Sequence, residues 1–105
     1  MNELKIIVQM LKQLLKEMEI VSSQGSGYYT CAPFLKRYNK LLQEAQRIFS
    51  QSYSVSVINT FEPLAEADPK DPSEKGKVLL SIRVETSELI TLLETVLQQQ
   101  EENKQ

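Results

Sequence analysis

Residues 4–21 read LKIIVQMLKQLLKEMEIV, and their apolar side chains recur every three and four positions. This spacing forms one broad apolar stripe along an amphipathic helix, which needs a partner surface to bury it. The stripe consists of Leu4, Ile7, Leu11, Leu14, Met18 and Val21, widened by Val8 and Leu15. Three further apolar residues, Ile6, Met10 and Ile20, fall outside it. The sequence therefore predicts a first helix over residues 2–21 with surplus apolar surface.

A turn without apolar residues follows at residues 22–27, where two glycines can adopt positive φ. Pro33 then suits the first turn of a second helix, because its missing N–H would have no partner there. Over residues 34–49 the apolar side chains gather on one side, and Lys36, Lys40 and Arg47 lie opposite them. We therefore expect two antiparallel helices joined by a glycine-containing turn.

Two later segments, residues 52–61 and 78–85, fit either a helix or a strand. Each contains an alternation of polar and apolar side chains, which is typical of a strand, but each also carries apolar residues at helical spacing. Asp71, Pro72 and Glu74 favour a helix, because they supply an N-cap, a first-turn proline and a capping-box glutamate. We expect a small antiparallel all-α bundle of three to four helices. The alternative is an α+β fold with two helices, a β-hairpin at about 53–61 and 78–85, and a C-terminal helix.

The chain of 105 residues is of a size that forms one domain. We expect this helical domain to span residues 1–97, with an acidic, proline-containing loop at about 62–71 and a final helix from Pro72 to about Gln100. The glutamine-rich residues 98–105 are expected to fray as a polar tail.

The composition argues against several function classes. Hydrophobic residues make up 41 % and charged residues 25 %, with a net charge of −2, no histidine and one cysteine. Such a chain should fold, and it lacks the usual catalytic base and the usual zinc ligands. We therefore expect no enzymatic activity, no catalytic residues, no cofactor and no metal. With no possible intrachain disulfide, no signal peptide and no long apolar run, we also expect a cytoplasmic protein that does not enter a membrane.

Four residues are candidates for partner binding. Tyr28 and Tyr29 follow the glycine turn, and tyrosine offers a large contact area with a polar tip. Leu80 and Val84 fall outside the apolar stripe of a continuous final helix, so a further surface should cover them. Together with the surplus in the first helix, they suggest a protein-interaction or regulatory module that self-associates.

The strip formed by Lys36, Lys40 and Arg47 supports an alternative function. Cations along one helix face can follow the phosphates of a nucleic acid, which predicts a nucleic-acid or nucleoprotein accessory. A small-molecule pocket lined by Tyr28, Tyr29, Phe34 and Tyr38 is a further variant of the binding hypothesis.

Overall fold

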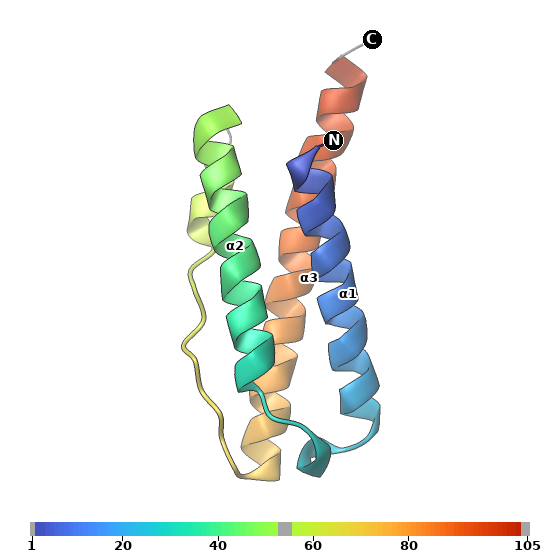
Figure 1. Cartoon of the computed structure of the whole chain (residues 1–105), viewed down its shortest axis with the longest axis vertical. Coiled ribbons are helices and arrows are strands. Elements are labelled where there is room, and N and C mark those ends of the chain that lie inside the picture. The colour runs from blue at the N-terminus through green and yellow to red at the C-terminus, as the bar shows by residue number, and fades with distance from the viewer. Residues whose placement is uncertain (1, 53–55, 104–105) are drawn as a thin grey trace.

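The computed structural model describes residues 2–52 and 56–103, and it is an all-α bundle. Three α-helices, α1 (Glu3–Ser23), α2 (Ala32–Ser52) and α3 (Pro72–Asn103), are accompanied by two short 3-10 helices, η1 (Ser26–Tyr28) and η2 (Val57–Thr60). The described ranges contain no strand. Figure 1 shows α1 running against both α2 and α3, which run in the same direction. The prediction of a small all-α bundle is confirmed.

The beginning and end of α1 follow from its flanking residues. The Asn2 side chain caps the helix by accepting a hydrogen bond of 2.8 Å from the Leu4 N–H. At the other end Gly25 has a φ of 90°, a conformation that strains any residue with a Cβ atom. This glycine ends the first helical segment and leads through η1 into α2.

A long connection returns the chain from the end of α2 to the start of α3 (Figure 1). We call residues 61–71, which carry no helix, the crossover segment. The Asn39 side chain of α2 donates to the Leu64 carbonyl and accepts from the Leu64 N–H, both at 2.8 Å. Gln46 donates to the carbonyl of Phe61 at 2.9 Å. These bonds satisfy backbone groups of the crossover segment and hold it along α2.

The core lies where the three helices meet, and it continues beneath the crossover segment. Phe61 and Leu64 of that segment pack against it as partly buried side chains. Most of the contributions from the helices are aliphatic: Leu4, Leu11, Leu14 and Met18 from α1, Leu35, Tyr38, Leu42 and Phe49 from α2, and Leu79, Ile82, Leu89 and Leu93 from α3. Burial of this apolar surface is the main stabilising term for the bundle.

The hairpin alternative is wrong at residues 78–85, which lie inside α3. Asp71 accepts a hydrogen bond from the Glu74 N–H at 3.2 Å, so the predicted cap starts the helix ahead of the ambiguous region. Leu79, Ile82 and Thr86 are then buried at helical spacing. Of the other half of the hairpin, residues 57–60 form η2, and residues 53–55 lie outside the described residues.

Helix α3 also extends to Asn103, into the segment assigned from sequence to a polar tail. Lys5 of α1 lies 3.4 Å from Glu101 in this part of α3, forming an exposed ion pair. Lys12 and Glu94 pair in the same way at 3.0 Å. Both contacts join residues that the antiparallel packing of α1 and α3 brings side by side.

Candidate functional site

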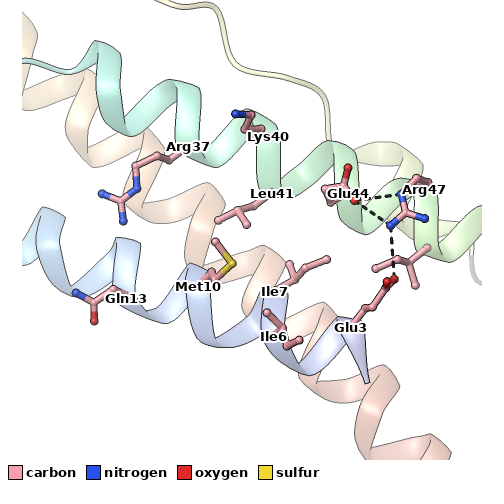
Figure 2. Close-up of a pocket in the computed structure, with 11 residues that line it drawn as sticks. Glu3, Ile6, Ile7, Met10, Gln13, Arg37, Lys40, Leu41, Glu44 and Arg47 are labelled. Carbon is pink, nitrogen blue, oxygen red and sulfur yellow. Dashed lines mark hydrogen bonds and ion pairs between the residues drawn. The ribbon is translucent and has the colours of Figure 1, made fainter. Parts of the chain in front are cut away.

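The most distinctive surface feature is an open groove between α1 and α2, with a volume of about 440 Å³. Its apolar lining comes from Ile6, Ile7 and Met10 of α1 and from Leu41 and Ile48 of α2. Polar and charged side chains surround this lining: Glu3, Gln13, Arg37, Lys40, Glu44 and Arg47. Figure 2 shows Arg37 at one end of the groove, Glu3 and Arg47 at the other, and the labelled apolar side chains between them, with Lys40 on the α2 border at the level of Leu41.

Two large apolar side chains in the groove are open to solvent. Ile6 is 43 % exposed and Met10 is 51 % exposed, whereas Ile7, Leu41 and Ile48 beneath them are buried. An apolar patch with a polar border is typical of a surface that binds another protein. The groove therefore combines an apolar centre with groups that can orient a partner.

One end of the groove is held together by ion pairs between the helices. The Arg47 guanidinium donates to Glu44 at 2.9 Å and to Glu3 of α1 at 3.5 Å. Hydrogen bonding to Glu44, with the nearby charge of Glu3, raises the pKa of Arg47. Two carboxylates face one guanidinium here, so this end carries one net negative charge.

The opposite end contains Arg37, which is paired with a carboxylate of α1. Arg37 donates to both oxygens of Glu17, at 3.0 and 2.7 Å, a bidentate pair that lowers the pKa of Glu17 and neutralises both groups. Lys40 makes no ion pair within the described ranges. This end is therefore neutral, and the positive charge that remains in the groove belongs to Lys40, which lies beside Leu41 near the middle.

The predicted partner-binding residues lie outside this groove. Tyr28 is 80 % exposed in η1, while Tyr29 is half-buried against the core. Leu80 and Val84 are exposed on α3, as their positions outside its stripe predict, but neither lines any of the three grooves described here. The structure does not bring Tyr28, Leu80 and Val84 together with Ile6 and Met10.

The predicted basic face is divided between two grooves. Lys36 and Lys40 line a polar groove between α2 and the crossover segment, which also contains Glu66. Arg47 lies on the border of the apolar groove, where Glu3 and Glu44 neutralise it. The pairing with Glu3 comes from a residue distant in sequence, so the helical pattern alone does not reveal it.

The predicted small-molecule pocket has no counterpart among the three described grooves, because Tyr28, Tyr29, Phe34 and Tyr38 line none of them. Phe34 and Tyr38 are buried core residues. Tyr38 is fully enclosed, and its hydroxyl has no hydrogen-bond partner among the residues that the structure describes. Burial therefore raises its pKa above the ordinary value of 10.0, and Glu85 and Glu88 add to the effect.

Cys31 has the environment of a structural residue. It is buried, its N–H donates to Asp68 at 3.1 Å, and its thiol lies 3.6 Å from the Lys75 carbonyl. Burial and the Asp68 charge raise the pKa of the thiol, which keeps it protonated and poorly nucleophilic.

Within residues 2–52 and 56–103, no group of three or more acidic or cysteine side chains is placed to hold a metal ion. In the same ranges, no helix is both long and apolar enough to cross a membrane. Comparison of the chain with protein-family models, with curated proteins and with solved structures finds no match.

Proposed function

We propose that this protein is a self-associating protein-interaction or regulatory module without catalytic activity, and that the groove between α1 and α2 is its binding surface. The exposure of Ile6 and Met10 above a buried apolar floor carries the proposal. Covering both side chains removes apolar surface from water, which is the principal driving force for association.

The composition of the groove suits a protein partner. Methionine adapts to differently shaped surfaces because its side chain is unbranched and flexible. Apolar grooves between helices commonly bind a further helical face, with charged residues at the border selecting orientation and partner. A cytoplasmic location remains part of the proposal, since a reducing compartment suits the single free thiol of Cys31.

The experiment that tests this function measures absolute mass by light scattering on a sizing column over a range of protein concentrations. The wild-type chain should form a dimer or larger species, and Ile6→Glu should shift the equilibrium toward a monomer. Ile20→Glu is the matched control, because Ile20 lies on the same helix, is 49 % exposed and does not line the groove.

Circular dichroism and thermal unfolding should show that both variants fold. A wild-type chain that stays monomeric at every concentration would contradict the proposed self-association. Equal effects of Ile6→Glu and Ile20→Glu on the mass would contradict the assignment of the interface to this groove.

A further inference from the structure

The groove has a layout that suits one kind of occupant. We propose that it binds the same groove of a second copy of this chain, with the two copies related by a twofold axis that runs perpendicular to the helices. This inference rests on the proposed self-association and specifies its geometry. In the dimer, α1 and α2 of one copy lie antiparallel to α1 and α2 of the other.

The spacing of the lining residues is symmetric about the centre of the groove. On α1, Glu3 and Gln13 lie three residues outside Ile6 and Met10, respectively. On α2, the lining runs from Arg37 to Ile48 and has Leu41 and Glu44 near its centre. A twofold axis through the midpoint between Ile6 and Met10 therefore places Ile6 of one copy against Met10 of the other.

The two helices have a register that allows one axis to serve both. Because α1 and α2 are antiparallel, the contact between Glu3 and Arg47 sets Ile6 and Met10 of α1 beside the middle of the α2 lining. Figure 2 shows this order, with Arg37 and Gln13 at one end, Met10 and Leu41 in the middle, and Glu3 and Arg47 at the other end. The midpoints of the two lining segments thus lie at the same level.

The charges on the α2 border complement each other under this symmetry. The group of Glu3, Glu44 and Arg47 carries one net negative charge, and Lys40, near the middle of the groove, carries one positive charge. Lys40 and Glu44 lie one helical turn apart on the border of the groove. An antiparallel second copy places Lys40 beside the second copy's Glu44, and the contact occurs twice in each dimer.

A twofold axis parallel to the helices would not make this contact. It would set α2 of each copy against α1 of the other, so Lys40 would lie opposite the middle of the α1 lining and not beside Glu44. Opposite charges placed on either side of the axis are what a self-complementary twofold contact requires.

Charge reversal tests this geometry. Lys40→Glu and Glu44→Lys each create two like-charge contacts in an antiparallel dimer, so each variant alone should weaken dimerisation about tenfold or more. An equimolar mixture of the two variants should recover the wild-type mass, because every reversed charge then faces an opposite one. Lys36→Glu is the matched control, since Lys36 lies on α2 one turn before Lys40 but outside the groove, and it should leave the dissociation constant within about twofold.

The outcomes separate the geometry from the proposed function. A wild-type dimer that Ile6→Glu dissociates, but that neither charge reversal weakens, would overturn the antiparallel pairing and leave the self-association standing. Tighter association of Lys40→Glu alone would also overturn the antiparallel pairing. A wild-type chain that is monomeric throughout would overturn both proposals and leave the groove to a partner of different sequence.

Discussion

The buried hydroxyl of Tyr38 allows a sharp test of the core. Substitution to Phe removes one polar atom that has no described hydrogen-bond partner and keeps the ring that fills the space. Burying a hydroxyl without a hydrogen bond costs about 1–3 kcal/mol, as measured by protein mutation. We therefore expect Tyr38→Phe to raise the free energy of unfolding by about 1 kcal/mol at pH 7, a value at the lower limit because removal of the oxygen also loses some packing contacts.

This gain should be visible as a change in melting temperature. An unfolding entropy of about 2.1 cal/mol/K per residue gives roughly 0.22 kcal/mol/K for a chain of 105 residues. A gain of about 1 kcal/mol then corresponds to an increase in Tm of about 4–5 °C. Tyr28→Phe is the control, because Tyr28 is exposed and its substitution should change the free energy of unfolding by less than about 0.5 kcal/mol.

The alkaline pH dependence gives a second, independent readout. The pKa of Tyr38 is raised above 10.0 in the folded protein, so the unfolded chain loses this proton first as the pH rises. The contribution of the Tyr38 hydroxyl to the free energy of unfolding is therefore constant below pH 10. Above pH 10 this free energy falls by up to about 1.4 kcal/mol per pH unit until the folded-state pKa is reached. The advantage of Tyr38→Phe over the wild type should grow between pH 10 and 11.

Urea unfolding followed by circular dichroism, from pH 7 to pH 11, measures both effects. Titration of the other groups is common to the two proteins and cancels in the difference between them. A loss of more than about 1 kcal/mol for Tyr38→Phe at pH 7 would show that the hydroxyl is hydrogen-bonded. A difference that does not change above pH 10 would show that the hydroxyl titrates as in the unfolded chain. Either result would contradict the reasoning.

Three further substitutions test local contacts. Asn39→Ala should lower the free energy of unfolding by about 1–3 kcal/mol and speed proteolysis of the crossover segment, because it removes both hydrogen bonds to Leu64; unchanged cleavage would contradict that role. Arg37 lowers the pKa of Glu17, so this carboxylate stabilises the fold above pH 4.5, and the stabilisation is lost as the pH falls through its folded-state pKa. Glu17→Gln should remove this acid dependence of the free energy of unfolding. It should cost less than about 1 kcal/mol at pH 7, since the ion pair is exposed. Gly25→Ala should cost about 1–3 kcal/mol in thermal melts through its φ of 90°, as no atom lies within 4 Å of the added Cβ; a neutral result would show that the turn readily adopts another conformation.

The helices were predictable because their signals are local. The apolar spacing of residues 4–21 and 34–49, and the capping residue Asp71, act over a few positions and need no knowledge of the rest of the chain. The direction of α3 was not predictable in the same way. It depends on the path of the crossover segment along α2, which Asn39 fixes through a hydrogen bond to Leu64, 25 residues away.

The candidate site shows a similar limit. The apolar surplus of Ile6 and Met10 is visible in the sequence, but so is the surplus of Leu80 and Val84, and the pattern gives no reason to separate the two pairs. Only the packing of α1 against α2 sets the first pair above a buried floor and leaves the second pair on a helix face outside the groove. The sequence also overestimates the positive charge of the basic face. Glu3 of α1 neutralises Arg47 of α2, and this pairing joins two separate helices.

The crossover segment has a consequence for how the chain can be divided. Residues 65–67 are exposed and carry no helix, and the hydrogen bonds that hold the segment lie on either side of them, to α2 at Phe61 and Leu64 and to the Cys31 N–H at Asp68. Cutting the backbone there would produce one piece with α1 and α2 and another with α3, each with a complementary apolar face. The two pieces could then be expressed separately and made to reconstitute the bundle, which would convert an intramolecular packing interface into a binding equilibrium with a dissociation constant of its own.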